Sequence, residues 1–378
     1  MTNAATSAIA EMDARPAAAA AATTTNADAA GASIKNLPVN LFAAVMGLSG
    51  LAMGWRLAHT EFGAVVPRVV SDVIGLFATF VFVVLAIGYG AKLLRHPAAV
   101  KAEFHHPIAG NFFGTIAIAL LLQSAVLGHY NDTLGRVMWI AGTVATLLLA
   151  AHVVSRLLGG NGHPAHAVPA WIIPGVAALD IPVTGSHMPM AWAGEVLLLS
   201  AAVGSVLAVV LFTMIVTRLI QHEPLAPAMT PSLLILVAPF EVGFTAYVNL
   251  TGRVDLFAGL LFYFGVFLFV VLAPKVFKRS VPFGAGWWAI SFPLAAMVNA
   301  GVVYAGVRGV WALKLLAGAL LVLFTAVLFV LAVRTARVLF KWAVVGELRG
   351  AEAAPRPSTL AAGVNRWRVF CGGRHFES

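Results

Sequence analysis

Ten apolar stretches separated by short polar breaks run along the chain between residues 37 and 341. About twenty apolar residues cross the hydrocarbon core of a bilayer as one helix, and each stretch is about that long or longer. The connections alternate between short ones and longer, basic ones, which groups the stretches into five pairs. The pattern predicts an all-α membrane protein of five helical hairpins, with spans at 37–58, 69–93, 107–128, 133–158, 168–187, 191–220, 229–250, 254–277, 284–305 and 309–341.

Prolines separate the odd-numbered spans from the even-numbered ones. One stands at the start of, or just before, every odd span, and more lie inside three of them, whereas the even spans contain none before their ends. An interior proline leaves a carbonyl without its donor, which lipid tolerates only where neighbours, water or a cavity compensate. We therefore expect the odd helices to form an inner pore ring and the even helices an outer ring that faces lipid. The odd-span prolines are Pro38, Pro107, Pro169, Pro174, Pro182, Pro231, Pro239, Pro282 and Pro293.

Composition excludes an ordinary soluble enzyme. Only 10% of the 378 residues are charged and 60% are hydrophobic, whereas soluble domains carry about 25% charged residues. The net charge of +9 comes from residues at span ends, which argues against nucleic acid as a partner. The chain has no phosphate-binding loop, nucleophile elbow or zinc-protease motif, so we expect no enzyme and no ATP-driven pump.

The distribution of Lys and Arg predicts the orientation. Most of the 24 basic residues fall on the side that holds both termini, which are therefore expected in the cytoplasm of a bacterial-type inner membrane. Residues 34–342 form the predicted transmembrane domain, between a disordered tail at 1–33 and a polar cytosolic tail at 343–378. The other side carries only Arg56, Arg68, Arg136, Arg253, Arg308 and Lys314.

Few ionisable groups lie inside the odd spans. Asp180 in span five and Glu241 in span seven are acids at membrane depth, which marks them as functional candidates. Each is a possible proton-coupling carboxylate, and Glu241 is alternatively a structural acid at the kink after Pro239. No run of Lys or Arg lines the predicted path, so anion passage would depend on weak positive potential from backbone amides at kinks.

The histidines raise one alternative from the enzyme class, a haem-bearing membrane oxidoreductase. Such a protein needs axial histidine pairs at matched depth on facing helices, and only His152 lies well inside a span. The pairs His105-His106 and His163-x-x-His166 lack carboxylate or cysteine neighbours, and the single cysteine, Cys371, lies in the C-terminal tail. We therefore expect neither a cofactor nor a metal.

Five motifs in order along the odd spans resemble the tellurite-resistance/dicarboxylate transporter (TehA-like) family, which includes bacterial TehA, fungal malate and sulfite transporters and the slow-type anion channels of plant guard cells. The resemblance covers about residues 35–342. The matching segments are Leu37-Pro38 with Met46-Gly47-Leu48, His106-Pro107 with Asn111-Phe112-Phe113, Pro169-Ala170-Trp171 with Pro174, Ala238-Pro239, and Trp287-Trp288 with Ser291-Phe292-Pro293.

This resemblance implies a homotrimer in which each subunit has its own central pore, occluded by Phe292. Phe42, Phe113 and Phe240 are weaker candidates for aromatics that face the pore. Gly47, Pro174, Pro239 and Pro293 are further pore-lining candidates, although plain helix packing explains a single glycine equally well. The chain departs from many relatives at Ala177-Ala178 and at Glu241, which leaves selectivity open.

Together these features predict a channel or channel-like transporter that passes small anions of the chloride, nitrate, sulfite or C4-dicarboxylate class down their gradient, with Phe292 as its gate. The alternative is a proton-coupled exporter of C4-dicarboxylate (malate), sulfite or tellurite. In that case Glu241 or Asp180 takes the proton.

Overall fold

The computed structural model describes residues 33–63, 65–160 and 164–353, so most of the two predicted tails, together with Cys371 and His163, lies outside the described residues. The described residues form eleven α-helices and no strands, which confirms the all-α prediction. Five helices follow the predicted odd spans and are called here the proline-led helices: α2 (Phe42–Phe62), α5 (Phe113–Gly128), α7 (Ile173–Gly185), α9 (Ala238–Thr251) and α11 (Ser291–Arg308). Their partner helices are α3 (Arg68–Arg95), α6 (Asp132–Leu158), α8 (Ala193–Gln221), α10 (Leu256–Val276) and α12 (Trp311–Ala353).

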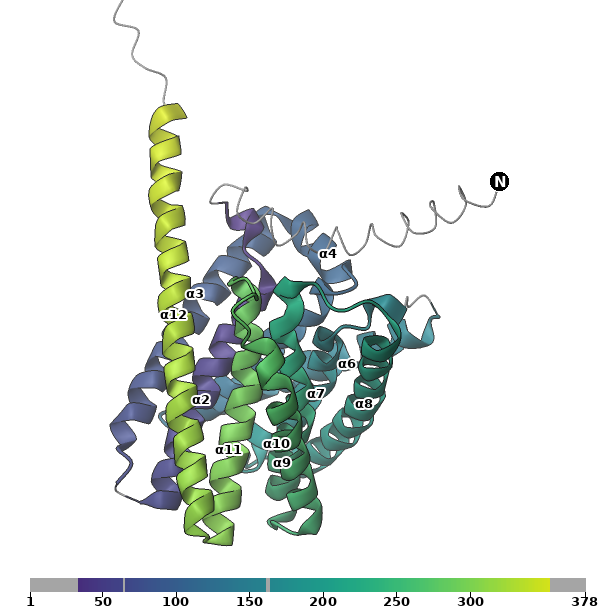
Figure 1. Cartoon of the computed structure of the whole chain (residues 1–378), viewed down its shortest axis with the longest axis vertical. Helices are drawn as coiled ribbons and strands as arrows, with labels where there is room; N and C mark the ends of the chain where they lie inside the picture. Colours follow the sequence, from purple (N-terminus) through teal and green to yellow (C-terminus); the bar gives the residue numbers. More distant parts are fainter. Residues whose placement is uncertain (1–32, 64, 161–163, 354–378) are drawn as a thin grey trace, which may run out of the picture.

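Nine of the predicted spans are helices long and apolar enough to cross a membrane, in the part of the chain that the structure describes. The remaining span, predicted at 168–187, is a shorter apolar helix, Pro169–Gly185. The last helix, α12, continues to Ala353, beyond the predicted end of its span at 341, and projects past the rest of the bundle (Figure 1). Forty-three residues of α-helix measure about 65 Å at 1.5 Å per residue, more than a bilayer core requires.

Each proline-led helix begins with a short stretch of 3₁₀-helix and then continues as α-helix. These 3₁₀ segments are η2 (Val39–Leu41), η3 (Ala109–Phe112), η5 (Pro169–Ile172), η6 (Pro227–Val237) and η7 (Ala285–Ile290). Pro174 and Pro239 lie in the first turn of α7 and α9, where a backbone N–H would lack an intrahelical partner in any residue. Pro174 and Pro239 therefore mark junctions between 3₁₀ and α structure.

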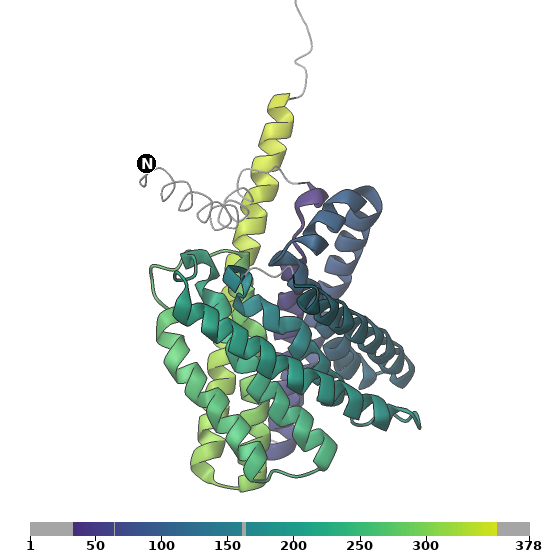
Figure 2. The same ribbon diagram turned by 90° about the vertical axis from the view of Figure 1, so that its right-hand side faces the viewer.

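The two helices of each pair pack against each other, and the proline-led helices also contact one another. Helix α2 contacts α5, α5 contacts α7, α7 contacts α9, α9 contacts α11, and α11 contacts α2. Figure 2 shows these helices beside their partners from a second direction. In the most apolar windows of the proline-led spans long enough to cross a membrane, 56% to 83% of residues are buried, against 17% to 39% in the partner spans. The partner helices therefore carry most of the exposed apolar surface.

Glycines set the spacing between α2 and α11. A Cβ placed on Gly47, Gly50 or Gly54 would lie 2.4 to 2.6 Å from an atom of Ser291, Ala295 or Asn299 respectively. Helices that lack side chains at the crossing can approach closely, which favours association in a membrane. Gly47 therefore serves helix packing, the alternative explanation for this residue, and it is not among the residues that line the cavity described below.

A helix that the hydropathy pattern did not indicate, α4 (Pro97–His105), joins the first pair to the second. Its residue Glu103 accepts hydrogen bonds from the backbone N–H of Val39 at 2.9 Å, the hydroxyl of Tyr89 at 2.9 Å and the ammonium of Lys92 at 2.6 Å. Lys92 is 4% exposed and also donates to the carbonyl of Leu37. Glu103 thus ties α4 and α3 to the segment that leads into α2.

Candidate functional site

A cavity of about 770 Å³ lies among all five proline-led helices. It opens toward the hairpin end of the bundle, defined as the end where the helices of each pair are joined, after Phe62, Gly128, Gly185, Thr251 and Arg308. The lining residues follow helical spacing along one face of each helix. On α11 they are Phe292, Ala295, Ala296, Asn299 and Val303.

Phe292 lies at the inner limit of this cavity. It is the lining residue closest to the N-terminal end of α11, and its side chain is 9% exposed. On α11 the lining begins at the second residue of the helix, whereas on the other proline-led helices it begins further along, at Gly50, Leu122, Asp180 and Val242. The cavity therefore lies toward the hairpin end of the bundle, and Phe292 is its innermost lining residue on α11.

Polar side chains stand along the cavity wall. Asp180 is 1% exposed, and within the described residues its Oδ2 has no hydrogen-bond partner. Asn299 donates to the carbonyl of Gly50 at 3.3 Å, while its Oδ1 has no partner in the same part of the chain. Asn249 donates to the carbonyls of Pro182 and Val183 at 3.1 and 2.9 Å. The wall thus combines apolar residues with polar side chains that are able to bind a polar solute.

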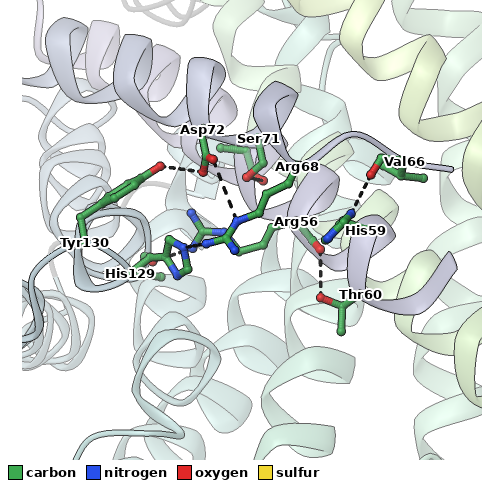
Figure 3. Close-up of polar contacts among 11 residues, drawn as sticks. Arg56, His59, Thr60, Val66, Arg68, Ser71, Asp72, His129 and Tyr130 are labelled. Carbon is green, nitrogen blue, oxygen red and sulfur yellow. Dashed lines mark hydrogen bonds and ion pairs between the residues drawn. The ribbon is translucent and has the colours of Figure 1, made fainter. Parts of the chain in front are cut away.

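Basic side chains gather where the cavity reaches the hairpin end (Figure 3). The Nη1 of Arg56 donates to the carbonyl of Ala125 at 3.2 Å. Arg68 donates to Nε2 of His129 and lies 4.0 Å from Asp72, which also accepts a hydrogen bond from Tyr130 at 2.6 Å. Arg56 and His129 line the cavity itself.

His129 is neutral in this arrangement, because a guanidinium can only donate to its ring nitrogen. Partial burial, followed by the nearby charges of Arg56 and Arg68, lowers the pKa of His129 below its usual value, whereas Asp72 acts in the opposite direction. The cluster therefore carries two permanent arginine charges and one carboxylate around a neutral imidazole.

Glu241 lies away from the cavity. It is completely buried in α9, and its carboxyl group faces Gly265 of α10, where an added Cβ would be 2.3 Å from Oε1. Neither carboxyl oxygen has a hydrogen-bond partner among the described residues. Of the two acids singled out in the sequence, only Asp180 lines the cavity.

The weaker aromatic candidates pack against other rings and do not line the cavity. Phe240 lies between Phe212 of α8 and Phe264 of α10, with centroid distances of 5.3 and 4.6 Å. Phe42 and Phe113 both contact Tyr89, at 6.1 and 6.0 Å. The proline candidates Pro174, Pro239 and Pro293 are buried in the first turns of α7, α9 and α11, outside the cavity lining.

The histidine inside a span faces an aromatic ring. His152 lies against Phe104, with ring centroids 5.0 Å apart. Within residues 33–63, 65–160 and 164–353, no group of three or more His, Cys, Asp or Glu side chains is arranged to hold a metal ion.

The sequence model of the SLAC1 family, described as voltage-dependent anion channel, matches residues 36–336. The chain belongs to this family. It is similar to the tellurite resistance protein TehA homolog of Haemophilus influenzae, with 28% identity over 71% of this chain and 81% of the relative. It is also similar to an uncharacterized transporter of Methanocaldococcus jannaschii, with 26% identity over 70% of this chain and 84% of the relative.

Plant members of the SLAC1 family are similar over a smaller share of their own length. The guard cell S-type anion channel SLAC1 of Arabidopsis thaliana is 25% identical over 81% of this chain and 56% of the plant protein. The family is one of channels and transporters, which agrees with the absence of enzyme motifs in the sequence. The resemblance stated from the five motifs is thereby confirmed.

Sequence reasoning missed most of the lining residues of this SLAC1-family chain. In the sequence, Arg56 serves only as one of the basic residues that indicate orientation, and no motif singles out His129. Thr245 and Asn249 follow Val242 on one face of α9 at spacings of three and four residues, and Asn299 follows Phe292 two turns later on α11. This stripe of polar residues at helical spacing is a sequence signal that could have identified the faces of α9 and α11 that line the cavity.

Proposed function

We propose that this protein is an anion channel or channel-like transporter whose pore passes among the five proline-led helices and is closed by Phe292. The cavity carries the proposal, because it is lined by all five of these helices and ends at the ring of Phe292. Membership of the SLAC1 family gives the substrate class, small anions, of which chloride, nitrate, sulfite and C4-dicarboxylates are the candidates.

The proposed mechanism is passive passage. The isolated polar groups along the wall bind an anion weakly, and weak binding suits conduction, since a tightly held ion does not leave. The phenyl ring of Phe292 blocks the path by its volume and by forming a dry constriction that an ion cannot cross with its water. Removal of the ring would connect the cavity with the opposite half of the bundle.

The proposed setting is a bacterial-type inner membrane with both termini in the cytoplasm. The excess of Lys and Arg on the side of the termini supports this orientation, which turns the hairpin end and its cavity outward. The exposed apolar faces of the partner helices contact lipid and, in the homotrimer that the TehA-like resemblance implies, neighbouring subunits.

The test is anion current in planar bilayers, with Phe292→Ala compared with the unchanged protein. Phe240→Ala is the matched control, because it removes the same ring from a site that faces α8 and α10. We expect a weak current for the unchanged protein and for Phe240→Ala, and a strong current for Phe292→Ala. Equal silence in all three folded proteins would remove the gate assignment.

The second candidate, a proton-coupled exporter of C4-dicarboxylate, sulfite or tellurite, is favoured by one observation. Asp180 lines the cavity, and one of its carboxyl oxygens has no hydrogen-bond partner among the residues that the structure describes. Coupling requires that flux depend on the proton gradient and that Asp180→Asn abolish this dependence. Glu241→Gln is the control, since Glu241 lies outside the cavity lining. Ohmic flux that persists in Asp180→Asn would exclude the exporter.

A further inference from the structure

The guanidinium of Arg56 is incompletely paired in the described part of the chain. Its Nη1 donates to the carbonyl of Ala125, but its Nε and Nη2 are shielded from solvent and have no acceptor. A buried donor without an acceptor is destabilising, and more so when the group is charged. The unpaired N–H groups of Arg56 are therefore destabilising, and an acceptor that enters from the cavity would satisfy them.

The charges around Arg56 decide which kind of acceptor fits. Arg68, Asp72, His129 and Tyr130 surround it, and Asp72 is the carboxylate among them (Figure 3). Asp72 already lies beside Arg68 and accepts the hydroxyl of Tyr130. Two guanidinium charges thus face a single carboxylate, and the surplus positive charge favours an anion over a water molecule.

We propose that Arg56 forms an anion-binding site at the hairpin end of the cavity, where a small inorganic anion such as chloride waits before it passes Phe292. This inference deepens the proposed channel function and rests on it for the role of the site, although not for binding itself. Arg56 supplies the charge and the free N–H donors, and Arg68 supplies further positive potential. Asp72 weakens the attraction and keeps binding in the range where an ion can leave.

Binding is measured without any current, by the broadening of the ³⁵Cl NMR line during titration of the purified full-length protein with chloride. Arg56→Gln should raise the chloride dissociation constant by about ten-fold, the effect of losing one charge-assisted hydrogen bond. The matched control is Arg253→Gln, which removes the same charge from an exposed loop at the same end, outside the cavity lining. It should leave the constant unchanged within about two-fold, because salt screens distant exposed charges.

A second variant that is expected to bind chloride more tightly separates the proposed site from simple misfolding of the Arg56 variant. Asp72→Asn keeps an acceptor for Tyr130 and removes the local negative charge, so chloride should bind more tightly. If Arg56→Gln and Arg253→Gln broaden the line equally, or if Asp72→Asn does not tighten binding, the site is refuted. Currents through Phe292→Ala then report separately on the channel: a silent Phe292→Ala with intact chloride binding refutes the channel and leaves the site standing.

Discussion

Two glutamates of this protein, Glu241 and Glu103, should respond in opposite ways to the same substitution. Glu241 is completely buried, and neither carboxyl oxygen finds a partner in the described residues. A buried polar group without a hydrogen bond costs about 1–3 kcal/mol. Glu241→Met replaces the carboxyl with an apolar group of similar length and adaptable shape. We therefore expect the variant to be more stable by about 1–3 kcal/mol.

The matched substitution is Glu103→Met. Glu103 accepts three hydrogen bonds, from Val39, Tyr89 and Lys92. Its loss leaves the buried ammonium of Lys92 with the carbonyl of Leu37 and the ring of Tyr89 but no carboxylate among the described residues. Removal of one partner from a buried ion pair costs about 3–5 kcal/mol. The two variants thus differ by about 4–8 kcal/mol, although they remove the same chemical group.

Thermal unfolding in detergent, followed by the fluorescence of the nine tryptophans, measures both effects. At roughly 2 °C per kcal/mol for a domain of this size, Glu241→Met should raise Tm by about 2–6 °C and Glu103→Met should lower it by about 6–10 °C. Currents of Phe292→Ala should be unchanged by the additional Glu241→Met, because Glu241 does not line the cavity. A lower Tm for Glu241→Met would show that its carboxyl has a partner, and would refute the reasoning.

Three further outcomes follow from particular contacts. Gly135→Val should destabilise the crossing of α5 and α6 in the same melting assay, since even a Cβ would lie 2.5 Å from the Cα of Gly128; normal stability would contradict this packing. Asp255 caps α10 and accepts a hydrogen bond from the hydroxyl of Tyr247 at 2.6 Å, and these contacts lower the pKa of Asp255. Its contribution to stability is therefore present above about pH 4 and is lost as the pH falls through the lowered pKa. Asp255→Asn should flatten this part of the Tm–pH profile. The pKa of His129 is lowered, so anion current through Phe292→Ala should rise with acid only below about pH 6.5; a rise that begins above it, or one that survives His129→Gln, would place the titrating group elsewhere.

The sequence by itself determined the membrane class, the helix pairs and the family. A run of about twenty apolar residues is long enough to cross the bilayer core, so hydropathy located nine spans within a few residues of the observed helices, except at the end of α12, which continues to Ala353. The prolines predicted where the proline-led helices begin, because a residue without an N–H fits only the first turn or a break. The motif singled out Phe292, which lines the cavity, while its role as a gate stays a prediction.

Only the tertiary structure decided which way each side chain faces. Phe240, Glu241 and Val242 are consecutive, yet Phe240 packs on α8 and α10, Glu241 faces Gly265, and only Val242 lines the cavity. Successive residues of an α-helix point about 100° apart, and the apolar character of nearly every position hides that rotation in the sequence. The direction is set by neighbouring helices, as at Gly47 and Ser291, and the same packing brings Arg56 of α2 to His129 beyond α5.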